Sequence, residues 1–298
     1  QLMFIGDDLT DGLYEQVNKR CSWRKYLDIE VAPNLLQQIT ELVQQLNKLQ
    51  NIIKITYIAD GTSMLKPMFV KFIKNAKQIL VFEIVKENRP LADVLIGLFG
   101  ELIVLKITQL GLGSVWMGGD GFCYSSEDVQ KFLGSNNDFP ICIPFGYCED
   151  PTYVQRKRKT IEQLTDSWPQ SQLELFDCLN RAPTAMNQQS FKLVYEEGKV
   201  VIVPTKKEVG AWKFDWLDAG IVAAHAIVYF KNCQIKVTEG IEIYKMEQIQ
   251  SSIEIAEDQV TIVKSKSDPR QCVKAGIRIV SGVLVLVSGL IFYKLFKW

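Results

Sequence analysis

The chain has 298 residues, of which 47% are hydrophobic, and its 34 basic side chains are balanced by 34 acidic ones. This length can supply a core for one large domain or two small ones, and zero net charge argues against nucleic acid as the main partner. The seven cysteines form no Cys-x-x-Cys pair and there is a single histidine, so we expect neither a disulfide framework nor a metal site.

In the first half, hydrophobic periodicity and turn residues predict both helices and strands. They are, in chain order, an amphipathic helix over 33–49, strands over 52–59 and 79–85, a long apolar helix over 91–112, a short helix over 125–133 opened by a capping-box pattern, and a strand over 140–147. Because the last strand contains Pro140 and Pro144, we expect it near a sheet edge or a loop.

The second half repeats this order of elements. A helix is predicted over 172–179, strands over 191–195 and 199–203, a long apolar helix over 217–230, and β-rich segments over 241–263. We interpret the repeat as a diverged internal duplication, with a first half over 1–160 and a shorter second half over 161–263.

A basic linker over 264–274 leads into an apolar segment over 275–296. No charged residue lies between Ile279 and Tyr293, and a helix of this length, at about 1.5 Å per residue, spans a hydrocarbon core of about 30 Å. All faces of such a helix are apolar, whereas a surface helix has a polar side. We therefore expect a single-pass C-terminal tail anchor; the alternative is a buried core helix.

Basic residues before the apolar segment outnumber those after it, and this imbalance predicts the orientation of the chain. The positive-inside rule places the preceding domain on the cytosolic or matrix side of the membrane. The rather short apolar core and its basic ends favour a mitochondrial membrane.

The segment Arg20-Cys21-Ser22-Trp23-Arg24 is the first that could carry chemistry. In an extended segment, residues two apart point the same way, so two guanidinium groups and a hydroxyl would converge. Arginine offers forked, permanently charged donors that suit a phosphate or another anion. The alternative is a solvated basic edge.

A glycine-rich segment, Gly111-Leu-Gly-Ser-Val-Trp-Met-Gly-Gly119, follows the long helix of the first half. Its glycines would let backbone N–H groups approach a planar heterocycle, and the alternative is an ordinary turn from helix to strand. Because the segment follows a helix rather than a strand, it is not a dinucleotide-binding fingerprint.

Two further segments offer polar groups. The basic run 156–159 could close over a phosphate or simply be solvated, and the amides of 182–189 could contact the edge of a heterocycle or form a polar loop. His225 lies inside an apolar helical run, so we interpret it as a packed core histidine rather than a catalytic one.

Together these four segments resemble the FMN-dependent nitroreductase family over about residues 18–230. The order of motifs resembles the "putative TM nitroreductase" branch, in which the Ala-Pro element comes in the second half and one chain looks like a fused pseudo-dimer. The resemblance implies an α+β, nitroreductase-like fold with one FMN per chain. Two departures are Thr184 in place of the usual serine and Ser190-Phe191 in place of the usual Pro-Trp.

The resemblance also implies the residues that would bind FMN. The arginines of the first and third motifs would hold the phosphate, with Arg24 also at the pyrimidine edge, and backbone N–H groups of the glycine segment would lie near flavin N5. The implied cofactor-binding set is Arg20, Ser22, Arg24, Ser114, Gly118, Gly119, Arg156, Arg158, Pro183, Thr184, Ala185, Asn187 and Gln189. No catalytic side chain beyond the flavin is needed, because the hydride chemistry belongs to the cofactor.

These features imply a membrane-anchored FMN-dependent oxidoreductase that transfers hydride from NAD(P)H to a quinone, nitro compound or related aromatic acceptor. The family resemblance does not specify the substrate. A second hypothesis is an accessory subunit of a larger membrane complex, such as a mitochondrial respiratory one, with its flavin site retained or idle. The expected partners are NAD(P)H, the aromatic acceptor, membrane lipid and, in the second hypothesis, other membrane subunits.

Overall fold

The computed structural model describes residues 2–66, 72–118, 123–148, 156–196, 198–205, 208–209 and 212–245. All of them belong to a compact unit that spans Gln1–Gln250. The predicted linker over 264–274 and the predicted membrane segment over 275–296 lie outside the described residues. Within the described part of the chain, no helix combines the length and hydrophobicity needed to cross a bilayer.

One antiparallel sheet is built from the first half of the chain, in the order β2-β3-β6-β4, with β5 also paired to β6. Its strands are β2 (Ile53–Ile58), β3 (Gln78–Ile84), β4 (Gly113–Ser114), β5 (Met117–Gly118) and β6 (Asp138–Gly146). The helices of this half are α1 (Pro33–Lys48), α3 (Arg89–Gln109) and α4 (Ser126–Leu133). The predicted helices and strands of the first half are thus confirmed to within a few residues.

The second antiparallel sheet has the order β1-β11-β12-β8-β7. Its strands are β1 (Leu2–Ile5), β7 (Phe191–Glu196), β8 (Lys199–Pro204), β11 (Cys233–Val237) and β12 (Ile241–Lys245), and β9 (Glu208–Val209) pairs with β10 (Trp212–Lys213). The helices here are α5 (Ile161–Leu164), α6 (Leu173–Asn180) and α7 (Asp215–Phe230). Because β1 comes from the start of the chain, this sheet is not built from the second half alone.

Short 3₁₀ turns complete the described secondary structure. They are Asp7–Leu9, Tyr14–Gln16, Thr62–Met64, Gln170–Gln172 and Ala185–Asn187. The last of these lies in the segment that connects α6 to β7, which becomes important for the cavity described below.

Helix α1 shows how the periodicity of the sequence becomes packing. Its buried side chains are Ile39, Leu42, Val43 and Leu46, which are three or four positions apart, and Pro33 occupies the first turn, where no N–H donor is needed.

The start of α4 confirms the predicted capping pattern. The side-chain oxygen of Ser125 accepts from the backbone N–H of Asp128 at 3.4 Å.

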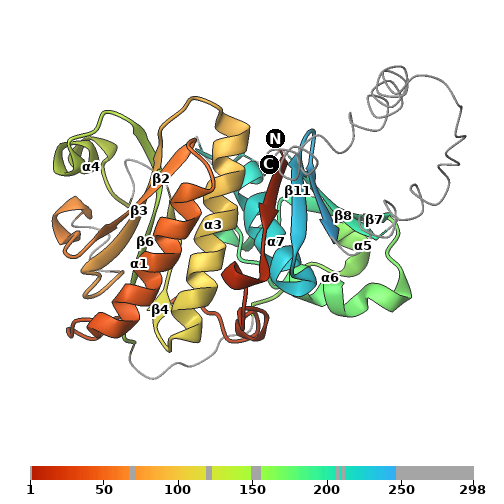
Figure 1. Ribbon diagram of the computed structural model, residues 1–298, viewed down its shortest axis with the longest axis horizontal. Coiled ribbons are helices and arrows are strands. Elements are labelled where there is room, and N and C mark those ends of the chain that lie inside the picture. Colours follow the sequence, from red (N-terminus) through yellow and green to blue (C-terminus); the bar gives the residue numbers. More distant parts are fainter. Residues whose placement is uncertain are drawn as a thin grey trace, which may run out of the picture. The chain divides into compact units, whose positions relative to one another are not determined.

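The two long apolar helices, α3 and α7, pack against each other between the two sheets (Figure 1). Glycines permit the close approach. A Cβ atom on Gly97 would lie 2.1 Å from the carbonyl oxygen of Leu217, and one on Gly220 would lie 2.3 Å from that of Val94. No other residue type fits these two positions without separating the helices. This helix pair forms the centre of the hydrophobic core.

The strand over 140–147 was predicted near a sheet edge or a loop, and β6 lies one position in from the edge, with β3 on one side and the two-residue strands β4 and β5 on the other. The prolines are tolerated for local reasons. Pro140 falls where the register with β3 shifts, and Pro144 contributes its carbonyl, which accepts from Val115 N at 3.3 Å. Neither position requires a donor.

The structure has the predicted α+β character, since both sheets are antiparallel and the helices pack on their faces. Each sheet has one long buried helix against it, α3 for the first and α7 for the second. The division into halves over 1–160 and 161–263 and their origin by duplication stay predictions.

Candidate functional site

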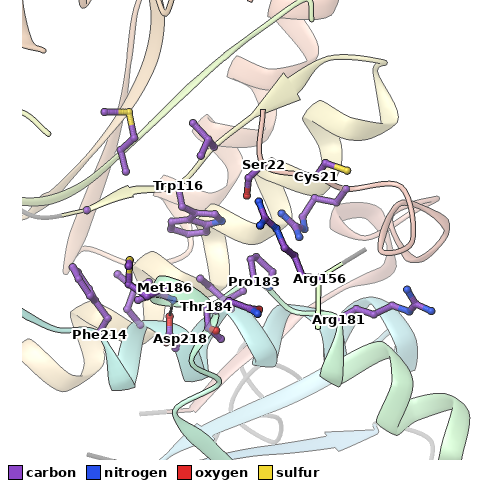
Figure 2. A pocket seen from close by; sticks show the side chains of 18 of the residues that line it. Cys21, Ser22, Trp116, Arg156, Arg181, Pro183, Thr184, Met186, Phe214 and Asp218 are labelled. Carbon is purple, nitrogen blue, oxygen red and sulfur yellow. Dashed lines mark hydrogen bonds between the residues drawn. The ribbon is translucent and has the colours of Figure 1, made fainter. Parts of the chain in front are cut away.

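A cavity of about 1010 Å³ lies where segments from both halves of the chain meet. In Figure 2, Ser22 and Trp116 face Pro183, Thr184, Met186, Phe214 and Asp218 across it, and Arg156 lies between the two sides. Most of the predicted site residues line this cavity. They are Arg20, Ser22, Arg24, Gly118, Arg156, Arg158, Pro183, Thr184, Ala185 and Asn187.

Three predicted residues are not among those that line the cavity. Ser114 is only 3% exposed, and its carbonyl accepts from Trp23 N at 2.9 Å, so it fixes the backbone of the Arg20–Arg24 segment from behind. Gln189 is 1% exposed, and its side-chain oxygen accepts from Lys159 N at 2.7 Å. Gly119 lies outside the described residues.

One end of the cavity is strongly cationic. Arg20, Ser22 and Arg24 all line it, but Cys21 and Trp23 line it too, so the lining does not confirm the predicted alternation of this segment. Within the described part of the chain, the side chains of Arg24 and Arg156 have no hydrogen-bond or ion-pair partner. The Nε of Arg20 is buried without a hydrogen bond but lies 3.6 Å from Glu101 Oε1, with which it forms an ion pair. Arg24, Arg156 and the terminal nitrogens of Arg20 can therefore donate to an anion.

Arg158 lies two residues from Arg156 but its donors are already in use. Its Nε donates to the Asn180 carbonyl at 2.6 Å, and its two terminal nitrogens donate to the Ala182 carbonyl and the Asn187 side-chain oxygen. Burial, and then the charge of Arg20, lower the pKa of Arg158 to about 10. Arg158 therefore ties the segment after α6 into place, and only two of its five N–H groups stay free for a ligand.

The segment from Thr184 to Gln189 has an unusual backbone. Met186, Asn187 and Gln189 have φ angles of 52°, 56° and 48°, a left-handed region that L-residues seldom occupy. Hydrogen bonds hold this conformation, since Gln189 N donates to the Thr184 hydroxyl at 3.0 Å and Asn187 N donates to the Thr184 carbonyl at 2.9 Å. Strain of this kind persists where the surroundings enforce it, and it is concentrated at functional sites.

The other end of the cavity is apolar. It is formed by Trp116 and Met117 from the glycine-rich segment and by Phe214, Leu217 and Ile221 around the start of α7. The sequence analysis assigned no role to these side chains, and Phe214, Leu217 and Ile221 lie outside its motifs. Trp116 and Met117 lie within the glycine-rich segment, so the segment was found without its side chains being assigned a role.

Asp218 is a buried carboxyl in the cavity wall that the sequence analysis missed. One of its oxygens accepts from Ala185 N at 2.9 Å. Burial raises the pKa of Asp218 to about 8, although the Ala185 N–H opposes the shift. It is therefore mostly protonated at neutral pH. In the sequence, Asp218 looks like an ordinary acidic residue in the first turn of a helix, which hides its burial.

His225 does not line the cavity. Its ring is fully buried between helices and contacts the Cys178 carbonyl and the side chain of Glu101. The core position predicted for it is thus confirmed. The sequence analysis did not identify Glu101 as its partner.

The chemistry of the cavity follows from its two ends. Guanidinium groups at one end suit a phosphate, while aromatic and aliphatic side chains at the other end suit a planar apolar ring. A ligand that carries both groups would be held in one orientation.

Comparison with known proteins agrees with this chemistry. The family described as "Putative TM nitroreductase" matches residues 12–229. A nitroreductase structure from Thermotoga maritima shares the fold with a TM-score of 0.55 and 20% identity, covering 79% of this chain and 94% of that one. No curated protein sequence matches the chain.

Smaller nitroreductases match about half of the chain. One from Desulfovibrio desulfuricans, solved in complex with FMN, has 16% identity and a TM-score of 0.41 and covers 52% of this chain and 95% of that one. An FMN-dependent enzyme from Mycobacterium smegmatis, solved with NADPH, has 11% identity and a TM-score of 0.39 and covers 46% and 88%. Since the family match extends over most of the sequence, the chain belongs to the TM nitroreductase family.

Proposed function

We propose that this protein is an FMN-dependent oxidoreductase that passes hydride from NAD(P)H to a quinone, a nitro compound or a related aromatic acceptor. NAD(P)H is oxidised to NAD(P)⁺, and the acceptor gains the hydride and a proton from solvent. The observation that carries the proposal is a cavity of about 1010 Å³ that has a cationic end and an aromatic, apolar end. Family membership supports the same activity.

The residues present fit FMN on chemical grounds. Its phosphate needs several charged donors, and Arg24 and Arg156 line the cavity with no partner among the described residues. Arg20 also lines the cavity, and because its Nε faces Glu101 Oε1 at 3.6 Å, its terminal guanidinium nitrogens are the donors left for the phosphate. FMN, when bound, supplies the hydride chemistry.

The protein's own part is binding, orientation and exclusion of water. The arginines and Ser22 would hold the phosphate, and the backbone of Gly118 would face the ring. Trp116 and Phe214 give the ring apolar surfaces and keep water out, which strengthens electrostatic interactions inside the cavity. Segments of both predicted halves contribute, which supports the pseudo-dimer hypothesis and a stoichiometry of one FMN per chain.

The test is an absorption spectrum of the purified full-length chain, with and without added FMN. We expect a flavin band at one FMN per chain that bleaches anaerobically on addition of NADH or NADPH. Arg20→Ala combined with Arg24→Ala removes charged hydrogen bonds of about 1.5–3 kcal/mol each, so FMN affinity should fall at least 100-fold. Lys48→Ala, at the exposed end of α1, is the matched control and should stay yellow.

Two results would contradict this proposal. A double arginine variant as yellow as the parent would show that the phosphate is held elsewhere. A colourless protein that co-purifies with other membrane subunits would support the accessory-subunit hypothesis in place of the enzyme.

We also propose that residues 275–296 anchor the protein in a membrane, with the mitochondrial inner membrane as the site and the preceding domain in the matrix. The support is the uncharged stretch between Ile279 and Tyr293 and the excess of basic residues before it. Carbonate extraction of membranes should leave the protein in the pellet, and protease added to intact organelles should leave the domain uncut. Release by carbonate, or cleavage by external protease, would reject the anchor or its orientation respectively.

A further inference from the structure

Glu101 is a fully buried carboxylate in α3, directly behind the cavity wall. Three side chains from distant parts of the sequence converge on it. Trp116 Nε1 donates to its Oε2 at 3.0 Å, His225 Nε2 lies 3.1 Å from its Oε1, and Arg20 Nε lies 3.6 Å from the same Oε1. Two of these three residues, Arg20 and Trp116, line the cavity.

The hydrogen-bond geometry determines the position of one proton on the His225 ring. Its Nδ1 lies 2.8 Å from the carbonyl oxygen of Cys178, and a carbonyl oxygen can only accept, so Nδ1 must carry hydrogen. The backbone of His225 is fixed on the same side, because the Cys178 thiol donates to the His225 carbonyl at 3.4 Å. The ring is thus locked between α6 and α3.

A second proton must lie between His225 and Glu101. With Nδ1 already protonated, an unprotonated Nε2 would face a carboxylate oxygen at 3.1 Å, and two lone pairs would oppose each other in a buried site. Either imidazolium donates to carboxylate, or a protonated carboxyl donates to neutral imidazole. Both forms give the pair a total charge of zero.

Among the described residues, few other charged or titratable groups contact the pair. Arg20 faces Glu101 and the Cys178 thiol faces the His225 backbone from α6, while Trp116 does not titrate. Since the pair is neutral, the charge of Arg20 is not cancelled, and the trio of Arg20, Glu101 and His225 carries one net positive charge. Without the shared proton, the trio would be neutral.

We propose that Glu101 and His225 are positioning residues whose shared proton holds Arg20 and Trp116 in the cavity wall and keeps that wall cationic. The inference rests on the proposed function, because its consequence concerns the flavin. The ring of the reduced cofactor carries an additional negative charge. A wall with one more positive charge therefore binds the reduced form more strongly than the oxidised form, and this raises the reduction potential of the flavin.

The first experiment needs no variant. His225 is the only histidine in the sequence, so ¹⁵N-histidine labelling of the full-length protein gives a spectrum of this ring alone. We expect the spectrum to show a hydrogen atom covalently attached to Nδ1. A ring whose Nδ1 carries no hydrogen would overturn the inference, whether or not the protein binds flavin.

The second experiment compares two variants that differ in charge. Glu101→Gln keeps the total at one positive charge, because its amide can donate to neutral His225 and accept from Trp116. His225→Gln keeps a donor toward Glu101 but removes the shared proton, so the trio becomes neutral. Dissociation constants for oxidised and reduced FMN, together with the midpoint potential, are measured for both variants and the parent.

We expect His225→Gln to weaken the binding of reduced FMN about tenfold more than the binding of oxidised FMN, which lowers a two-electron potential by about 30 mV. For Glu101→Gln, the ratio of the two affinities should stay within about threefold of the parent, and the potential within about 14 mV. A merely structural role would weaken both forms equally and leave the potential unchanged, and that result overturns the inference while the proposed function stands.

Two outcomes keep the two proposals apart. If His225→Gln does not fold, Glu101→Gln still tests the charge argument. The argument is overturned if the ratio of its dissociation constants for oxidised and reduced FMN differs from that of the parent by tenfold or more. A protein that binds no flavin would contradict the proposed function and the effect on potential together, although the histidine spectrum still decides whether Nδ1 carries the hydrogen on which the inference depends.

Discussion

On one side of the cavity, the two arginines of the segment from Arg20 to Arg24 make few bonds to the protein. On the other side, the segment from Pro183 to Gln189 is held in place by its own polar groups. The same contrast separates Arg156 from Arg158, two residues apart in the chain. Residues that belong to one family motif therefore divide into those available to a ligand and those that shape the wall. Stability measurements can distinguish them.

The largest effect is expected for Arg158→Ala. It removes three hydrogen bonds from a charged donor, and at about 1.5 kcal/mol or more each this lowers the free energy of unfolding by at least about 4.5 kcal/mol. Arg156→Ala is the matched control, since it should change that free energy by less than about 0.5 kcal/mol while weakening the binding of FMN about tenfold. Urea unfolding measures the stability of the two variants, and flavin titration measures their affinity for FMN. Equal losses of stability in the two variants would erase the distinction drawn between them.

The next effect depends on pH. The pKa of Asp218 is raised to about 8 in the folded protein, whereas in the unfolded chain it is about 3.9. Between these values the folded state binds the extra proton, so stability falls as pH rises. Asp218→Asn keeps an acceptor for Ala185 N but has no titrating group. The free energy of unfolding of this variant, relative to that of the parent, should therefore rise by about 2–3 kcal/mol as the pH is raised from about 5.5 to about 7.5. A constant difference across this range would mean that the carboxyl is ionised throughout.

A smaller effect isolates the hydroxyl that supports the strained segment. Thr184→Val deletes the acceptor for Gln189 N, which is buried, at nearly constant volume and should cost about 1 kcal/mol. Thr184→Ser keeps the hydroxyl and should cost distinctly less. Chemical unfolding of the two variants side by side gives the answer, and identical values would assign the effect to packing.

The smallest effect concerns backbone strain alone. Met186 has a φ of 52° and is 78% exposed, so its side chain contributes little to the core. Met186→Gly should be more stable than Met186→Ala by about 0.5–1 kcal/mol, because glycine adopts this conformation without a steric penalty. The comparison of two small residues cancels the loss of the methionine side chain. If alanine proved the more stable, the segment would not be strained at this position.

Periodicity predicted the long elements well because a buried face leaves a regular pattern of apolar residues, as in α1. Strands β1 and β11 were missed, since they are short and their pairing joins opposite ends of the chain. The proline-containing strand β6 was found, but its place inside the sheet depends on a register shift that local sequence does not reveal.

At the site, most of the residues predicted from the motifs line the cavity, but their hydrogen bonds could not be predicted. Arg158 and Gln189 look like ligand contacts in the sequence, yet their bonds within the protein become visible only when α6 and the following segment are in place. Asp218 gave no signal because its burial is a tertiary property. The pairing of Glu101 with His225, 124 residues apart, likewise required the packing of α3 against α7.

The pairing of β1 with β11 has a consequence for how the chain is made. Asp7 and Asn232, which hydrogen-bond next to this strand pair, are 225 residues apart. A growing polypeptide therefore releases its first strand long before the partner leaves the ribosome, and closing so large a loop slows folding. Until β11 emerges, β1 has no partner. In a chain that lacks Leu2–Ile5, the outer edge of β11 stays unpaired and can recruit other chains, so removing this strand should reduce the yield of dispersed protein before it affects any chemistry.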